Sequence, residues 1–233
     1  MAELSRESLA LSGVIADVVW RRSARARRIS LRIDAGRGVV VVTLPPRSSK
    51  RAGMALLTEN GNWVATRLAA LPSGIVFEDG AAVPIAGVPH PIEHRPLARG
   101  GAWLEEGSLV VTGDASFLPR RVTDFLRQEA RRRLSTLAWA HAAGAGLKPR
   151  RIIIKDTRSR WGSCAADGTL AFSWRLVMAP PAVQDYVAAH EVAHLRHLNH
   201  GPGFWALVAV LCPGWRAASD WLRDEGVSLM RVG

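Results

Sequence analysis

The pattern of apolar and polar positions in the first half of the chain predicts short β-strands around one helical segment. Residues 28–44 alternate apolar and polar side chains, cross a glycine-containing turn and continue as an apolar run, which is the pattern of a β-hairpin. Residues 49–71 have apolar side chains at the spacing of a helix. Short apolar runs broken by Gly and Pro return over residues 80–112, and they predict small antiparallel strands.

A long amphipathic helix is predicted at the start of the second half. After Pro119, apolar residues recur every three or four positions until the chain reaches Gly144, and arginines occupy the opposite face. Proline is tolerated in the first turn of a helix, so the pair Pro180-Pro181 indicates another helix start. The remaining expected elements are strands at 151–155 and 169–176, a tight loop at 158–164, and helices at 204–211 and 215–225.

A change of composition at residues 114–119 separates the two halves. We predict a β-rich N-terminal region with one helix over residues 1–115, and a mostly helical domain with a small sheet over residues 116–233. The chain has 233 residues, of which 48% are hydrophobic, so it can bury a substantial core. Strands and helices that are segregated in this way predict an α+β fold.

Composition also indicates where the protein resides. No apolar run approaches the roughly 18 residues that span a bilayer, so no membrane partner is expected. Residues 1–20 carry scattered acidic side chains and lack the order of a signal peptide. Cys164 and Cys212 are too few for a disulfide framework. We therefore expect a cytoplasmic protein.

The net charge of +11 leaves two interpretations open. A basic excess of this size is typical of proteins that contact nucleic acid, nucleotides or anionic lipid. It is also expected when arginines simply fill solvated faces, and no nucleic-acid-binding motif accompanies the charge. A weak nucleic-acid contact through the basic surface therefore stays an alternative. The arginines gather in two stretches, Arg21, Arg22, Arg25, Arg27, Arg28 and Arg32, then Arg120, Arg121, Arg127, Arg131, Arg132 and Arg133.

The pentapeptide H-E-V-A-H, from His190 to His194, is the most informative motif of the chain. Residues four apart on a helix lie on one face about one turn from each other, so both imidazoles can reach a single ion. Glu191 lies beside them, where it would take a proton from water activated by the metal. This arrangement is the signature of zinc-dependent hydrolysis, above all of metalloproteases.

A catalytic zinc needs a third protein ligand, which the sequence offers downstream of the motif. His197 would lie about 10 Å along an unbroken helix from His190, too far for both to bind one ion. His200 is better placed, because Asn199 can end the helix and turn the chain back. His200 also follows His194 by six residues, the spacing of extended zinc motifs. The alternatives are no metal at all or a carboxylate of the last helix, Asp220 or Glu225.

Four sequence blocks, one of which contains the motif, carry a family resemblance. They are D-T-R-S-R-W-G-S-C at residues 156–164, S-W-R-L at 173–176, D-Y-V-A-A-H-E-V-A-H-L at 185–195 and N-H-G-P-G-F-W at 199–205. Together with an arginine-rich strand pair and a Trp-containing helix nearer the N-terminus, they resemble the YgjP-like family of predicted metal-dependent hydrolases, relatives of the SprT-like metallopeptidases. One mild departure is Val192, where the family usually has Leu.

The resemblance implies both a site and an architecture. His190, His194 and His200 would bind the metal, and Glu191 would be the catalytic acid/base. The catalytic half would be zincin-like, with helices packed on a small sheet whose edge strand could hold an extended substrate. We place that edge strand at residues 169–176.

The R-W-G-S-C block itself admits two interpretations. In a functional one, Arg160 steadies an oxyanion or a phosphate and Cys164 lies near the metal. In a structural one, Trp161 packs in the core and Gly162 permits a tight turn. We favour the structural interpretation, because a Trp-Gly pair at a strand connection is a common packing device.

Three functional hypotheses follow from these motifs. The leading one is a zinc-dependent hydrolase of the metallopeptidase type, with Zn²⁺ as cofactor and a peptide or protein as substrate. The alternative is a metal-dependent nucleotide pyrophosphatase that cleaves nucleoside triphosphates, with arginines holding the phosphates. The third is a nucleic-acid-associated protein with structural zinc, which is disfavoured because structural sites usually have four ligands rich in Cys.

Overall fold

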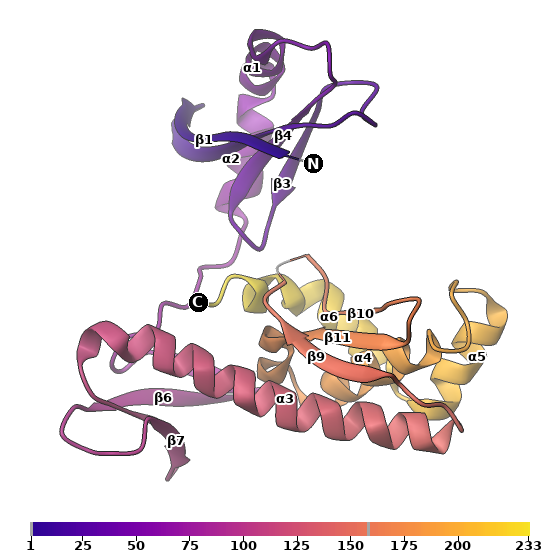
Figure 1. Cartoon of the computed structure of the whole chain (residues 1–233). Coiled ribbons are helices and arrows are strands. Elements are labelled where there is room, and N and C mark those ends of the chain that lie inside the picture. The colour runs from indigo at the N-terminus through magenta and orange to yellow at the C-terminus, as the bar shows by residue number, and fades with distance from the viewer. Residues whose placement is uncertain (1, 158) are drawn as a thin grey trace. The chain divides into compact units, whose positions relative to one another are not determined.

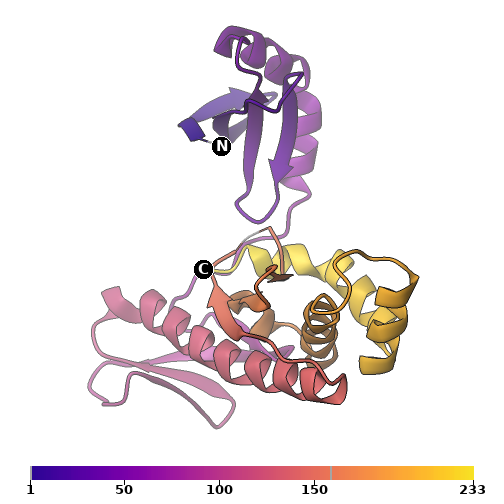
Figure 2. The same ribbon diagram turned by 45° about the vertical axis from the view of Figure 1, so that its right-hand side comes forward.

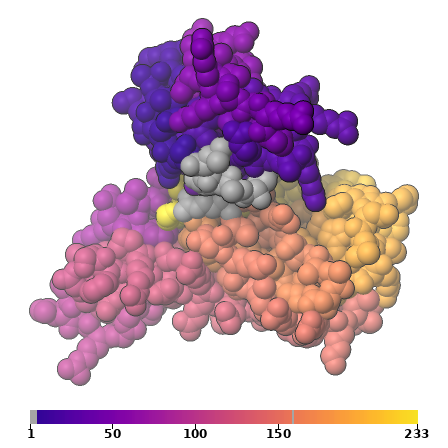
Figure 3. Space-filling view, turned by 45° about the horizontal axis from the view of Figure 1, so that its top comes forward, coloured from indigo at the N-terminus to yellow at the C-terminus, as the bar shows by residue number. Residues whose placement is uncertain are grey.

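The chain folds around two large hydrophobic cores (Figure 1). The structure is a computed structural model, and it describes residues 2–157 and 159–233. The chain separates into unit 1, Met1–Ser73, and unit 2, Gly74–Gly233. In the space-filling view, the atoms of unit 1 are coloured indigo to purple, and those of unit 2 run from purple through orange to yellow (Figure 3). Helices combine with small mixed sheets, which confirms the α+β class.

Unit 1 is a four-stranded sheet with two short helices. The strand order is β1-β2-β4-β3, in which β2 and β4 are parallel and the other neighbours antiparallel. The β3–β4 hairpin confirms the prediction for residues 28–44. The elements are β1 (Ala2–Leu11), β2 (Val14–Arg22), β3 (Ser30–Asp34), β4 (Val39–Leu44), α1 (Lys50–Glu59) and α2 (Gly61–Ala69).

Two features of unit 1 depart from the sequence prediction. Strands β1 and β2 were not predicted, although Ser12-Gly13 between them has positive φ at both residues, as in tight two-residue hairpin turns. The single helix predicted over residues 49–71 is two helices that break at Asn60, whose side chain donates a hydrogen bond to the Leu56 carbonyl. At Gly61 a Cβ would lie 2.6 Å from the Ser12 hydroxyl, so the start of α2 needs glycine.

The first sheet of unit 2 packs on the longest helix. Strands β5 (Ala82–Ile85), β6 (Val88–Arg95), β7 (Ala102–Glu105) and β8 (Ser108–Thr112) run in the order β5-β6-β8-β7. The prediction of antiparallel strands holds for two pairs, but β6 and β8 are parallel. Because Ile85 and Ile92 of this sheet share a core with Leu126, the unit begins at Gly74 rather than at the 115/116 boundary expected from composition.

Helix α3 (Leu118–Gly144) follows the short 3-10 turn η1 (Ala115–Phe117) and confirms the long amphipathic helix. It lies along α4 (Pro181–Ala193), the 3-10 segment η2 (Trp174–Met178) and β9 (Arg151–Lys155) (Figures 1 and 2). Its buried residues recur at helical spacing and face the core of unit 2. In the described part of the chain, no helix is both long and apolar enough to cross a membrane.

The second sheet of unit 2 has three strands in the order β10-β11-β9, with β10 at Gly162–Cys164 and β11 at Thr169–Ser173. Two predictions need correction. The expected loop over 158–164 contains strand β10, and Arg158 lies outside the described residues. The expected strand over 169–176 ends at Ser173, and it is the central strand, because β10 pairs with it on one side and β9 on the other. It therefore has no free edge, and the edge beside β11 belongs to β10.

Two helices complete unit 2. They are α5 (Pro202–Leu211) and α6 (Trp215–Met230), and both contact α4 or its neighbours. Each confirms a predicted helix, and α4 begins at Pro181 as the proline pair indicated. The sheet and the three helices α4, α5 and α6 bury one continuous core with α3.

A buried ion pair joins the D-T-R and S-W-R-L blocks. Arg175 in η2 is only 1% exposed, and its Nη1 donates to Asp156 Oδ1 at 2.5 Å, just after β9. Arg175 Nε donates to the Val232 carbonyl at 3.0 Å, and the guanidinium lies over the Trp174 ring. Partial burial, the largest single effect, raises the pKa of Asp156, but the hydrogen bond and charge of Arg175 and the charge of Arg127 act against it, and the pKa lies below its usual value.

We expect Asp156→Asn to destabilise unit 2, because it removes the negative charge that pairs with the buried Arg175 guanidinium. Loss of one partner of a fully buried pair costs about 3–5 kcal/mol, and the half-exposed Asp156 places the expected loss near 2 kcal/mol. Urea unfolding followed by Trp fluorescence measures it. Because the folded pKa of Asp156 is lowered, its stabilisation is present above the unfolded pKa of about 3.9 and is lost as the pH falls further.

The matched control is Asp124→Asn, which removes an equivalent charge from an exposed pair with Arg120 at 3.7 Å. Surface pairs contribute about 0–1 kcal/mol, so this variant should unfold almost as the parent does. Equal destabilisation by the two variants would contradict a special role for the Asp156–Arg175 pair.

Candidate metal centre

The histidines of the motif lie at the end of α4. The helix ends at Ala193, and His194 is its C-cap. The helix is therefore shorter than the sequence analysis assumed, and His197 lies beyond it rather than on its continued face. The chain turns through Asn199 and His200 and enters α5 at Pro202.

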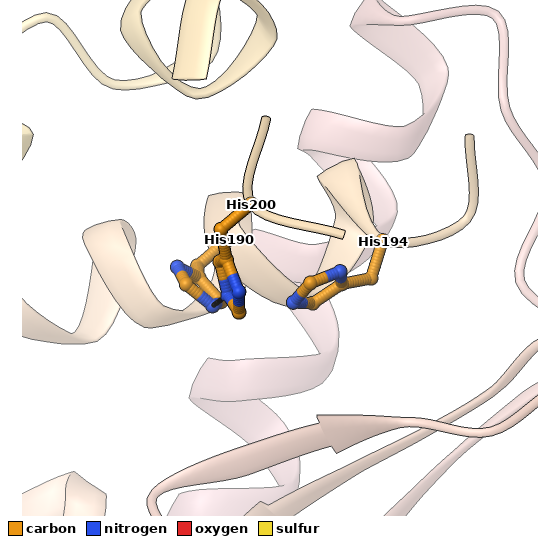
Figure 4. A group of neighbouring side chains, drawn as sticks. All are labelled: His190, His194 and His200. Carbon is orange, nitrogen blue, oxygen red and sulfur yellow. Dashed lines mark hydrogen bonds between the residues drawn. The ribbon is translucent and has the colours of Figure 1, made fainter. Parts of the chain in front are cut away.

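Three imidazoles converge at this turn (Figure 4). One ring nitrogen from each of His190, His194 and His200 lies within 4.8 Å of the others. The Nε2 atoms of His190 and His200 are 3.1 Å apart. His197, Asp220 and Glu225 are not part of this group, and Asp220 instead pairs with Arg223 at 2.9 Å. The structure thus brings together the three histidines that the sequence favoured.

Contacts around the cluster hold the rings in place. His194 Nδ1 lies 2.9 Å from the His197 carbonyl, so this nitrogen carries the proton and donates it, and Nε2 is left as an acceptor. The Phe204 ring, from the first turn of α5, lies 4.5 Å from the His194 ring and 4.7 Å from the His200 ring between centroids. Trp205 tilts against His200 at 5.8 Å. The two aromatic residues therefore anchor His200 beside the helix.

Burial sets the protonation of the cluster. Burial first, and then the charges of His194 and His200, together lower the pKa of His190 to about 4. Burial also lowers the pKa of His194. Near neutral pH these imidazoles are uncharged, and the neutral form is the one that ligates metals.

Glu191 is a buried carboxyl beside the cluster. It is 6% exposed, and burial raises its pKa to about 8, against the opposing charge of Arg160. Among the described residues, no donor reaches its Oε2 atom, although that atom is buried. A buried acceptor without a partner needs a further group, such as a water or a substrate proton, to satisfy it.

The donor set fits a catalytic metal better than a structural one. Three imidazoles with an orphaned carboxyl nearby correspond to three protein ligands and an open position, which is the arrangement of catalytic zinc sites. Cys164 and Cys212 are free thiols outside the histidine group. Burial raises the pKa of the Cys164 thiol, and the Glu191 charge raises it further, which disfavours the thiolate that ligates zinc.

Strand β10 presses against Glu191, and this contact explains Gly162. A Cβ at position 162 would lie 2.5 Å from Glu191 Oε1 and 2.6 Å from its Cγ. Sequence analysis interpreted Gly162 as a turn residue, but the close approach of β10 to α4 is what requires glycine. Trp161 next to it contacts Gly226 of α6, which agrees with its structural interpretation.

An H-E-x-x-H segment whose two histidines meet a third around a buried glutamate is typical of metal-dependent peptidases. The family model described as "YgjP-like, metallopeptidase domain" matches residues 27–225, and the chain belongs to this YgjP-like family. Among curated proteins, no relative matches the chain. A solved structure titled as the metallopeptidase zymogen of Pyrococcus abyssi abylysin is similar at 18% identity and a TM-score of 0.37, covering 40% of this chain and 95% of that one.

We expect Gly162→Ala to strain the site, because the added methyl group must displace either the Glu191 carboxyl or β10. Overpacking of this kind costs about 1–3 kcal/mol, and a thermal melt of the variant measures the loss. Gly214→Ala is the control, since a Cβ there meets nothing within 4 Å. If the two variants have the same melting temperature, contact with Glu191 does not require glycine at position 162.

Proposed function

We propose that this protein is a zinc-dependent peptidase in which His190, His194 and His200 hold the metal and Glu191 moves protons. The observation that carries the proposal is the convergence of three imidazoles next to a buried carboxyl with an unsatisfied oxygen. Membership of the YgjP-like family, whose model is a metallopeptidase domain, supports the same class of reaction.

Zinc, when bound, would act as a Lewis acid on the attacking water and on the substrate carbonyl. The protein supplies the rest of the chemistry. Nε2 of His194 is free for a ligand because Nδ1 is held by the His197 carbonyl. Phe204 and Trp205 fix the position of His200, which comes from a turn and would otherwise be the least constrained of the three.

Glu191 is the proton carrier in this proposal. Its carboxylate accepts a proton from the attacking water as the new carbon–oxygen bond forms, and it passes that proton to the leaving amine as the carbon–nitrogen bond breaks. Burial raises the pKa of Glu191 to about 8, and a carboxyl whose pKa lies near the working pH can both accept and release a proton. The close contact with Gly162 limits the positions that the side chain can adopt.

Strand β10 is the proposed support for the substrate. The sequence predicted residues 169–176 as the substrate-binding edge strand, but that segment lies in the middle of the sheet, so we assign this role to β10 instead. The outer side of β10 is a sheet edge next to Glu191, and an extended peptide paired there would gain main-chain hydrogen bonds regardless of its sequence. A peptide or protein substrate fits this arrangement directly.

The nucleotide alternative has weaker support. A phosphate clamp needs several cationic groups around the reacting atoms, and Arg160 is the cation whose charge acts on Glu191. Most of the α3 arginines are engaged elsewhere, as Arg127 is with Asp156 and Arg132 with Glu129. The structural-zinc alternative is also disfavoured, because the histidine group offers three ligands and no thiolate.

The ligand assignment predicts the metal content of the purified protein. The parent should contain about one zinc per chain, and His194→Ala should lose it, because two imidazoles rarely retain the ion. His197→Ala is the matched control, since its backbone carbonyl, and not its side chain, contacts His194. Elemental analysis of the three proteins checks the prediction, and full zinc in His194→Ala would rule out the assignment.

The mechanism predicts that Glu191→Gln keeps the metal and loses turnover by about a hundredfold or more, because an amide cannot accept the proton. The assay follows cleavage of a labelled unfolded protein, with a parallel incubation on nucleoside triphosphates. Peptide cleavage that depends on Glu191 supports the proposal. Triphosphate hydrolysis without peptide cleavage would replace it with the pyrophosphatase, and undiminished activity of the variant would remove Glu191 from the mechanism.

A further inference from the structure

The positive charge of the chain is concentrated in unit 1. Residues 1–73 hold twelve Arg and Lys against five Asp and Glu, a net charge of +7 out of the +11 of the whole chain. Three of the five acids already form ion pairs, so they do not neutralise the remaining basic side chains. These pairs are Arg6–Asp17, Arg32–Asp34 and Lys50–Glu7.

Three of the arginines of unit 1 lie on the connection between β2 and β3. Arg25, Arg27 and Arg28 are exposed there. Among the described side chains, those of residues 5–157 and 159–233, no carboxylate lies within ion-pair distance of any of the three. Like charges held this close on a short loop repel each other, and an anionic partner would relieve that repulsion.

The second arginine-rich stretch of the sequence differs in this respect. On α3, Arg120 pairs with Asp124, and Arg132 and Arg133 both bind Glu129. These arginines therefore form local ion pairs on the helix surface. In the unit 1 stretch, Arg32 pairs with Asp34, but Arg25, Arg27 and Arg28 have no such partner among the described side chains.

A groove beside this loop combines the charge with an aromatic surface. Its volume is about 390 Å³, and it lies between the edge strand β3 and the helices of unit 1. Its walls include Arg28, Ile29, Leu31, Leu56 and Trp63. Trp63 is 42% exposed, although its ring is large and apolar.

We infer that this groove, together with the Arg25–Arg28 loop, binds single-stranded nucleic acid. The loop arginines contact the phosphates, and the groove takes an unpaired base against Trp63, because sequence-independent single-strand binding combines a basic track with aromatic stacking. A duplex keeps its bases stacked inside and gives Trp63 no partner. An acidic peptide would pair with the arginines but offers no ring to the groove.

The test measures binding of a fluorescein-labelled oligothymidylate of about twenty nucleotides to the full-length protein by fluorescence anisotropy, over a series of salt concentrations. Trp63→Ala should weaken binding about tenfold, and Trp63→Phe, which retains an aromatic face, should recover most of it. The triple variant Arg25→Ala, Arg27→Ala, Arg28→Ala should reduce the slope of log affinity against log salt by about 2, at about 0.7 per phosphate contact.

The charge-matched control is Arg120→Ala, Arg132→Ala, Arg133→Ala, which lowers the net charge equally but removes paired arginines. It should leave binding almost unchanged. Circular dichroism and zinc content, which should stay at parental values in all variants, separate this inference from the peptidase proposal. Equal weakening by the two triple variants, tighter binding of a duplex of the same length, or displacement of the oligonucleotide by poly-glutamate at equal charge would each overturn the inference.

Discussion

The architecture of unit 2 depends on one buried guanidinium. Arg175 is held by Asp156 at the end of β9, by the Val232 carbonyl near the C-terminus and by the face of Trp174. A buried charge is tolerated only where such partners are supplied together, so the three segments must meet at this point. The meeting fixes where β9 ends and where η2 begins, and thereby the frame from which β10 and α4 extend. The D-T-R and S-W-R-L blocks, which are separate in the sequence, are therefore joined in the structure by one buried ion pair.

The chemistry of the site depends on how closely β10 approaches α4. Strand β10 approaches α4 so closely that position 162 has no room for a side chain. The same approach buries Glu191, raises its pKa and leaves one of its oxygens without a donor. Burial likewise keeps His190 and His194 neutral. Metal ligation needs neutral imidazoles, and a carboxyl whose pKa lies near neutrality can take up and release a proton; burial favours both.

The basic character of the chain has a different origin in each unit. On α3, Arg120, Arg132 and Arg133 pair with acids three or four positions away on the same helix. In unit 1 the arginines occupy a connection between strands, where neighbouring residues cannot face one another as they do on a helix. The two stretches of six arginines therefore differ: Arg120, Arg132 and Arg133 pair along their helix, whereas Arg25, Arg27 and Arg28 of unit 1 are exposed and have no ion pair among the described side chains.

The sequence alone determined the features that depend on local spacing. Helical period predicted α3, α5 and α6, the proline pair predicted the start of α4, and the spacing of His190, His194 and His200 singled out the group that converges. The features that only the tertiary structure decided depend on partners distant in the chain. These are the central place of β11, the edge position of β10, the parallel pairing of β6 with β8 and the assignment of residues 74–115 to the second core. The order of strands in a sheet and the close approach of a strand to a helix depend on which surfaces bury each other. A periodic sequence pattern indicates that a face is buried, but it does not indicate which element covers that face.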